Sequence, residues 1–267
     1  MSHMGISAER IRSAPARGRI PLAVRLLGLA LLAIVATAVI GRAALPPQGG
    51  VTVEGPLDPR GFRFVSVDEA TGRPTRYNPC EAIHYVVNAS RAPAGGLEDV
   101  QTALARTAEV SGLNFVYDGP TDEVSSPERA PYQPARYGEK WAPVLFDWVT
   151  TPLATPGGTA TANTTTIGLG GSDHAFNDRG EAVFTTGTVT LDATADLQAG
   201  FGGQTWGQAI LHEVGHVVGL AHVDDPSSVM NPLIGVRPAL WGPGDRAGLW
   251  QLGMGSSCLV EPPLPRS

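Results

Sequence analysis

The sequence predicts an α+β fold, in which a mixed sheet is flanked by helices within one domain. The 267 residues leave room for a single ordinary domain with flanking segments. The composition, 42% hydrophobic and 16% charged with 33 Gly and 23 Pro, is typical of a folded, loop-rich and partly β domain. Segments of strand composition and amphipathic runs occur along the chain, and we find no repeat of solenoid type.

The N-terminal part of the chain has the pattern of an export segment. The apolar run LLGLALLAIVATAVIG covers residues 26–41 and is closed by Arg42. It is preceded by five arginines, at Arg10, Arg12, Arg17, Arg19 and Arg25. A basic region followed by an apolar run predicts that the chain is exported.

Two interpretations of this segment stay open. One is a cleaved signal peptide, with small residues at Ala36 and Ala38 or near Ala43. The other is an uncleaved signal anchor over residues 20–42, which leaves a basic cytoplasmic N-terminus over residues 1–19. The long region before the apolar run favours the single-pass anchor, and a buried helix of a soluble domain is the third, less favoured interpretation.

Residues 43–75 are predicted to be a linker, because they are rich in Pro and Gly and have no apolar period. The domain is accordingly expected over residues 76–267.

The first expected elements of this domain are a strand, a helix and a second strand. AIHYVVN, residues 82–88, is rich in β-formers, and LNFVYDG predicts another strand over residues 113–117. Between them, apolar residues recur at helical spacing before Gly112 stops the run, at Leu97, Val100, Leu104 and Ala108.

Three further strands are expected before the next helix. The polar stretch 120–141 predicts a long surface loop, and PVLFDWV, residues 143–149, predicts a strand after it. Residues 159–171, TATANTTTIGLGG, predict a Thr-rich strand that ends in glycines, and residues 180–193 predict another strand or a hairpin.

A helix is then expected to carry the sequence HEVGH. Thr205 to Gln208 has the form of a capping box, with Thr205 as N-cap and Gln208 reaching back. Apolar residues follow at helical spacing, at Ile210, Leu211, Val214, Val217 and Val218.

The stretch HEVGHVVGLAH, residues 212–222, predicts a zinc site on this helix. His212 and His216 are four residues apart, so both imidazoles lie on one helix face and can bind one metal ion. Glu213 is displaced by about 100° from His212, which suits a general base better than a ligand. Gly219 can end the helix with positive φ, so that His222 approaches from another direction and the fourth zinc position stays open to water.

This motif resembles that of the metzincin zinc metallopeptidases. Met230 follows His222 within SSVMNP, and this interval, with Pro232 behind the methionine, is similar to the Met-turn of the matrixin branch. The resemblance implies a zincin fold with a mixed, twisted five-stranded sheet, an antiparallel edge strand, an active-site helix and a C-terminal helix. It also implies that Met230 lies below the zinc ligands.

The resemblance continues in GPGDRAGLWQLG, residues 242–253, which is similar to the C-terminal helix of matrixins. Asp245 matches the second of two adjacent acids and is expected to brace the Met-turn. The first acid, which can receive a freed N-terminal amine, is replaced by Gly244, and Val223 departs from the family's habit after the third histidine. These departures put the subfamily and its route of activation in doubt.

The resemblance also implies how substrate binds, as an extended peptide added to the edge strand. The candidate strands are IGLGGSDHAF, residues 167–176, and AVFTTGTVTL, residues 182–191, and the sequence leaves open which one is outermost. The loop 231–243 would form the outer wall of the pocket that receives the substrate residue after the cut bond. Its apolar side chains, at Leu233, Ile234 and Leu240, suggest an apolar preference.

Other metal sites receive less support. His174 and Asp173 suggest a second zinc site. Because the segment has only one histidine, we instead expect His174 to be a solvated loop residue. His84 is expected to pack on its strand. Structural Ca²⁺ is compatible with the family, and no residue of the sequence marks a site for it.

The two cysteines, Cys80 and Cys258, lie near the two ends of the domain. In an exported chain this even count predicts a disulfide. The alternative is that Cys80 blocks the zinc as a latency switch, which is disfavoured by its NPCE context and by its position next to the first strand, with no propeptide between them.

The sequence thus predicts a monomeric zinc metalloendopeptidase that cuts peptide bonds of extracellular proteins or peptides, with Glu213 as base. The first alternative is a zinc-bearing surface module that binds peptides without cutting them, which has no need of Glu213. The second is a zinc hydrolase acting on a non-peptide amide. Nucleic-acid binding is not expected, because the net charge is −6 and the arginines gather in the N-terminal segment.

Overall fold

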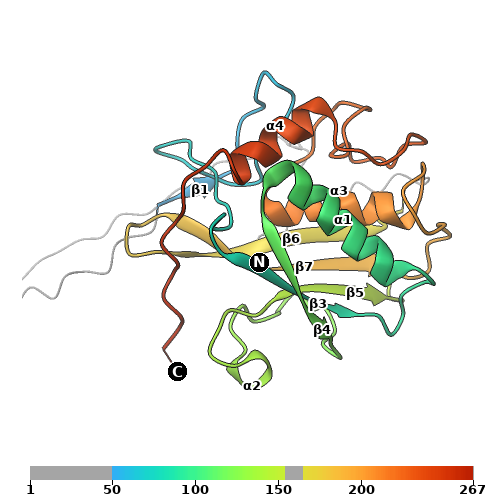
Figure 1. Ribbon diagram of the computed structural model, residues 1–267, viewed down its shortest axis with the longest axis horizontal. Helices are drawn as coiled ribbons and strands as arrows, with labels where there is room; N and C mark the ends of the chain where they lie inside the picture. Colours follow the sequence, from blue (N-terminus) through green and yellow to red (C-terminus); the bar gives the residue numbers. More distant parts are fainter. Residues whose placement is uncertain (1–49, 154–164, 267) are drawn as a thin grey trace, which may run out of the picture.

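The computed structural model describes residues 50–153 and 165–266. A five-stranded sheet with strand order β4-β3-β5-β7-β6 forms its centre (Figure 1). The strands are β3 (Ala82–Asn88), β4 (Asn114–Pro120), β5 (Val144–Val149), β6 (Gly168–Phe176) and β7 (Ala182–Asp192). The helices are α1 (Gly96–Ser111), α2 (Pro134–Tyr137), α3 (Trp206–Val218) and α4 (Pro243–Leu252), and a two-stranded sheet pairs β1 (Thr52–Val53) with β2 (Val67–Asp68).

The central sheet is mixed. Strand β3 runs parallel to β4 and to β5, and β5 runs parallel to β7. Strand β6 is antiparallel to β7 and lies at the edge of the sheet. The expected α+β fold with an antiparallel edge strand is therefore confirmed, and β6 is the outermost of the two candidate strands.

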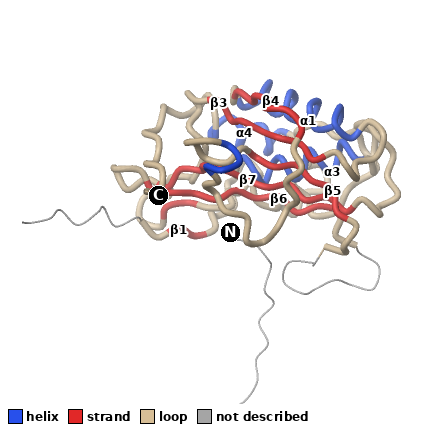
Figure 2. Tube along the Cα trace, turned by 90° about the horizontal axis from the view of Figure 1, so that it is seen from below, coloured by secondary structure: helices blue, strands red, loops and turns tan. Residues whose placement is uncertain are grey.

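The helices α1, α3 and α4 cover one face of the sheet, and the segment that contains α2 lies on the other (Figures 1 and 2). The core between helices and sheet is filled by large side chains that are almost fully buried, among them Trp148, Trp206, Phe146, Leu191 and Ile210. Helix α3 contacts α1 in the helical layer and packs on β6 and β7 of the sheet. This burial gives the later residues of α3 a rigid support.

Most expected elements are found where the sequence places them. Strand β3 covers the predicted residues 82–88, and α1 ends at Gly112, whose φ of 72° lets its N–H reach the Ala108 carbonyl. Residues 182–192 form one strand and not a hairpin. The Thr-rich strand is shifted, because β6 begins at Gly168 and continues through the glycines, while residues 159–164 lie outside the described part of the chain.

The expected linker over residues 43–75 needs a correction for its described part, residues 50–75. Phe62, Phe64 and Val67 are buried in the core. Backbone hydrogen bonds also join this segment to the loop after α3, from Val65 N to Gly219 O at 2.9 Å and from Ala221 N to Arg63 O at 2.8 Å. The segment belongs to the domain, and its irregularly spaced aromatic residues gave no period from which this could be predicted.

The predicted export segment, residues 20–42, lies outside the described residues. Among the helices that the structure describes, none has the length and apolar character needed to span a membrane.

A disulfide joins Cys80 to Cys258, with the two Cα atoms 5.4 Å apart. It fastens the segment after α4 beside the start of β3. Asn78 reinforces this link, since its side chain donates to the Leu259 carbonyl and accepts from the Leu259 N–H, each at 3.0 Å. With Cys80 bonded in this way, the structure offers no thiolate for the alternative in which Cys80 blocks a metal.

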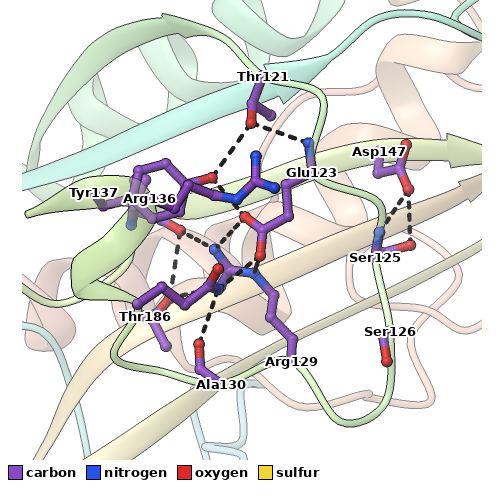
Figure 3. Close-up of polar contacts among 12 residues, drawn as sticks. Thr121, Glu123, Ser125, Ser126, Arg129, Ala130, Arg136, Tyr137, Asp147 and Thr186 are labelled. Atoms are coloured by element: carbon purple, nitrogen blue, oxygen red, sulfur yellow. Dashed lines mark hydrogen bonds and ion pairs between the residues drawn. The ribbon is translucent and has the colours of Figure 1, made fainter.

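The long polar loop expected over residues 120–141 encloses a buried ion pair (Figure 3). The Arg129 guanidinium donates to both oxygens of Glu123, at 2.9 and 3.1 Å, and to the Thr186 hydroxyl on β7 at 2.8 Å. Tyr137 donates to the same carboxylate at 2.6 Å. Although burial raises the pKa of Glu123, the hydrogen bonds from Arg129, Tyr137 and Gln133 outweigh it and hold the pKa below its usual value. The loop is thereby anchored to the sheet face opposite α3.

Candidate metal centre

Helix α3 begins after Thr205, as the sequence predicts, but its predicted capping box does not form. The Thr205 hydroxyl donates to the Gly202 carbonyl, and Gln208 accepts from the N–H of Gln204. The first N–H groups of the helix are instead satisfied by backbone carbonyls, Trp206 N by Gln198 O at 2.9 Å and Gly207 N by Gly200 O at 3.0 Å. The preceding loop therefore caps this helix.

His212 and His216 lie on the same side of α3, and their Nε2 atoms are 3.1 Å apart. The Nδ1 atom of His212 is 2.7 Å from the Val229 carbonyl oxygen, and that of His216 is 2.8 Å from the Leu220 carbonyl oxygen. A carbonyl oxygen only accepts, so Nδ1 carries the proton in both rings. Each Nε2 is left with a free lone pair that faces its neighbour.

His222 reaches the same point from the loop after the helix. Gly219 ends α3 with φ of 122°, and its N–H bonds back to the carbonyls of Gly215 and His216. The chain then turns, and the Nε2 atom of His222 comes within 3.1 Å of His212 Nε2 and 3.0 Å of His216 Nε2. Within the described part of the chain, this triad is the one group of at least three potential ligands that could hold a metal ion.

The three imidazoles are kept neutral by their surroundings. Burial lowers the pKa of His212 to about 4, helped by His222 and opposed by the Val229 hydrogen bond. Burial likewise holds the pKa of His216 well below its usual value. Burial also lowers the pKa of His222, against the charge of Glu54. Neutral rings with free lone pairs are the form in which histidine binds metal.

This donor set fits a zinc ion. Three lone pairs that converge without a cation or a proton between them repel one another, so their convergence calls for a positive centre. Nitrogens bound to one tetrahedral zinc at about 2.0 to 2.1 Å lie roughly 3.3 Å apart. The observed separations of 3.0 to 3.1 Å are close to that spacing.

Glu213 is next to the first ligand and is only 6% exposed. Burial raises its pKa to about 8, although a hydrogen bond from the Gly170 backbone acts in the opposite direction. The edge strand β6 passes directly over this residue. A Cβ atom built on Gly168 would lie 2.7 Å from the Glu213 carboxylate oxygen, and one on Gly170 would lie 2.5 Å from its carbonyl oxygen. The two glycines therefore let the strand approach the carboxylate.

Met230 is 1% exposed and packs against Gly215 of α3, where any side chain would overlap its sulfur. Asp245 holds the turn in front of it. Its carboxylate accepts from the Ser228 hydroxyl at 2.5 Å and from Val229 N at 2.8 Å, and Ser228 in turn accepts from Met230 N. Asp245 thus fixes the turn that contains Val229, whose carbonyl oxygen accepts the hydrogen bond from His212 Nδ1.

The two departures from the matrixin pattern have structural explanations. Val223 is buried, and its N–H donates to the Met230 carbonyl at 3.1 Å, which closes the loop between His222 and the methionine. Gly244 lies against the backbone of Arg60 and Gly61, and a Cβ atom there would overlap the Gly61 carbonyl oxygen. The N-terminal segment thus fills the space that an acidic side chain at this position would need.

The remaining candidate residues are not brought to the triad. His174 lies on β6 and stacks edge-on with Phe176 at 5.3 Å between ring centroids, and burial lowers its pKa. His84, which we expected to be packed, is exposed, and its Nδ1 atom is 2.6 Å from Asp118. In the loop 231–243, Leu233 and Leu240 are exposed, and Ile234 is partly buried.

Sequence reasoning missed several residues that shape this site. The carbonyls of Val229 and Leu220 fix the tautomers of two histidines, and Ser172 on β6 contacts the end of α3. Carbonyl acceptors have no sequence signal. The glycines at 168 and 170 were visible in the sequence, and their spacing of two could have indicated a strand face pressed against a neighbour.

A comparison with protein families supports a metallopeptidase domain. The model of the family described as Matrixin matches residues 171–251, a range that contains the three histidines, Glu213 and Met230. A search of curated proteins found no match. The fold, the triad and this match together show a matrixin-like catalytic domain in this chain.

Proposed function

We propose that the matrixin-like domain of this chain is a zinc-dependent endopeptidase that cuts extended segments of extracellular proteins or peptides. The observation that carries the proposal is the convergence of three neutral imidazoles beside a buried glutamate, which lies against the edge strand β6. When bound by His212, His216 and His222, a zinc ion supplies Lewis acidity, which polarises a carbonyl oxygen and lowers the pKa of water.

The residues of the chain account for the other parts of the reaction. The backbone of β6, the outermost strand of the sheet in the described part of the chain, is suited to bind an extended peptide as an added strand, which would hold the scissile bond over the triad. Glu213 takes a proton from the attacking water and passes it to the leaving amine. Burial raises the pKa of Glu213, which makes its carboxylate a stronger base than a solvated glutamate.

We also propose that the domain acts outside the cell as a monomer, held at the membrane if the N-terminal segment remains uncleaved. The disulfide between Cys80 and Cys258 supports an oxidising compartment. The basic and apolar pattern of residues 1–42 supports export.

The test is digestion of an unbiased peptide library by the zinc-loaded protein and by its Glu213→Ala and Glu213→Gln variants, with zinc content measured in each. We expect peptide cleavage in the wild type and a loss of about a hundredfold or more in both variants, at unchanged zinc content. Equal cleavage by all three proteins would overturn the role of Glu213. Zinc binding without cleavage would favour a peptide-binding module or an amide hydrolase with a non-peptide substrate.

A further inference from the structure

The hydroxyl groups of the buried Tyr77 and the half-buried Ser172 connect the segment before β3 to the end of α3. The Tyr77 hydroxyl is 2.8 Å from the Ser172 hydroxyl on β6, and Ser172 Oγ is 2.8 Å from the carbonyl oxygen of Val217 in α3. Because that carbonyl only accepts, Ser172 donates to it and accepts the hydrogen bond from Tyr77. The direction of both bonds is thereby fixed.

The carbonyl that Ser172 binds is one of the last in α3 and has no partner within the helix ladder. The carbonyls of Gly215 and His216 are taken by the turn at Gly219. Ser172 therefore supplies a side-chain cap to the helix end, one residue after the second histidine. The turn that carries His222 begins two residues later.

The surrounding residues leave room for this pair of hydroxyl groups. Gly187 on β7 lies opposite Ser172, and a Cβ atom built there would be 2.7 Å from Ser172 Oγ and 3.2 Å from the Tyr77 oxygen. Tyr77 itself is 6% exposed and packs on Phe184 at 5.5 Å between ring centroids. Burial raises the pKa of Tyr77 above its ordinary value, so the phenol keeps the proton that it donates.

Ser172 also lies on the same face of β6 as the two glycines pressed against Glu213, at alternate positions 168, 170 and 172. The glycines allow the strand to approach α3, and the Ser172 hydrogen bond ties it there. The distance between the peptide-binding edge and the proposed base is set by these three positions together.

We propose that Ser172 is a positioning residue for the reaction, oriented by Tyr77, which holds β6 at a fixed height over Glu213 and the end of α3. This inference rests on the proposed peptidase function for its kinetic consequence. Its structural part, the tie between β6 and α3, can be measured without any activity.

The experiment compares Ser172→Ala, Tyr77→Phe and the double variant by steady-state kinetics on a peptide that the wild type cleaves. We expect Ser172→Ala to lower kcat about tenfold or more with a smaller change in KM, because misplacement of the base affects the transition state most. Tyr77→Phe should have a smaller effect, and the double variant should fall no further than Ser172→Ala, because the two hydroxyls act in series.

Ser111→Ala is the matched control, because the buried Ser111 hydroxyl donates to the Thr107 carbonyl of α1 at 2.7 Å, away from the triad. It should lower stability without lowering kcat of the folded protein. Amide hydrogen exchange, read by mass spectrometry, should become faster in β6 and in residues 216–221 for Ser172→Ala and not for Ser111→Ala. Unchanged kcat together with unchanged exchange in Ser172→Ala would overturn the proposal.

If the wild type cleaves no peptide, the peptidase function fails, and the exchange measurement alone decides on Ser172. Additive losses in the double variant would show that the two hydroxyls do not act as one chain. An equal loss of kcat in Ser111→Ala would show that Ser172→Ala acts through general stability, and this result would overturn the positioning role.

Discussion

Among single residues, Asp147 on β5 shows how burial changes the pKa of a carboxyl group. Its side chain is fully buried, and one carboxylate oxygen accepts from the backbone and the hydroxyl of Ser125, at 2.8 and 3.0 Å. The other oxygen has no hydrogen-bond partner among the described residues. Burial raises the pKa of Asp147, and the hydrogen bonds from Ser125 lower it by less. The fold therefore binds the proton of this acid more tightly than water does.

This predicts a pH dependence of stability that an amide removes. A raised folded-state pKa means that the protonated acid favours folding, so the free energy of unfolding declines as pH rises from the ordinary pKa of the acid to its folded-state pKa. Asp147→Asn keeps an oxygen that can accept from Ser125 and cannot ionise. We expect the variant to lack this decline in urea unfolding measured over a pH series. A variant with the same slope as the wild type would show that folding does not raise the pKa of Asp147.

At this scale the sequence predicted chemistry better than orientation. The spacing of His212, His216 and His222 predicted one metal site, and the structure brings the three imidazoles together beside Glu213. The carbonyls of Val229 and Leu220, which set the ring tautomers, were not predictable. They come from loops whose path depends on contacts far along the chain, such as Asp245 with Ser228.

Among the elements, β6 requires glycine at position 170 and has room for a side chain at the neighbouring position 171. A Cβ atom on Gly170 would lie 2.5 Å from the Glu213 carbonyl oxygen, whereas one on Gly171 meets nothing within 4 Å. The two positions differ only in the face of the strand on which a side chain would lie. They form a matched pair for testing whether the strand must touch the helix.

We predict that Gly170→Ala lowers the free energy of unfolding by about 1 to 3 kcal/mol, because the strand has to move away from α3. It should also lower peptidase activity in the folded fraction. Gly171→Ala should remain within about 0.5 kcal/mol of the wild type. Thermal unfolding and the cleavage assay together check this, and similar values for the two variants would contradict a close contact at Gly170.

The contrast between β3 and β6 explains what sequence patterns predict at this scale. The β-branched and apolar residues of 82–88 make a strand by propensity and burial, and the prediction matched its bounds. In β6 the composition serves contact with α3, so propensity placed the strand too early. The capping box at Thr205 failed for a related reason, because the preceding loop had already satisfied the first N–H groups of α3.

At the scale of the whole molecule, the disulfide closes nearly the entire domain, since its cysteines are 178 residues apart in the sequence. A cross-link of such span restricts the unfolded chain strongly, with an upper figure of about 5 kcal/mol in the chain-entropy model. We predict that replacing both cysteines by serine lowers the free energy of unfolding by about 2 to 5 kcal/mol.

The check is chemical unfolding of the wild type, the double serine variant and Asn78→Ala, which removes the neighbouring polar link to Leu259 and keeps the disulfide. Asn78→Ala should cost about 1 to 3 kcal/mol. Identical unfolding midpoints for the wild type and the double serine variant would show that the cross-link adds no stability.

The sequence predicted the fold class of the domain correctly and placed its N-terminal boundary too late. Strand composition and the zinc motif were enough to predict a mixed sheet with an active-site helix, and the resemblance supplied the antiparallel edge. The packing of residues 62–65 onto the loop after α3 was not foreseen, because a Pro- and Gly-rich composition is shared by flexible linkers and by irregular segments that are well packed.

The contact between Gly61 and Gly244 has a consequence for how such a chain can change over evolutionary time. The Gly61 carbonyl occupies the place where any side chain at position 244 would begin. This course of the N-terminal segment and an acid at that position therefore exclude each other. We therefore expect position 244 and the course of residues 60–61 to covary among related chains. In this chain, the space beside position 244 is already filled by the backbone of its own N-terminal segment.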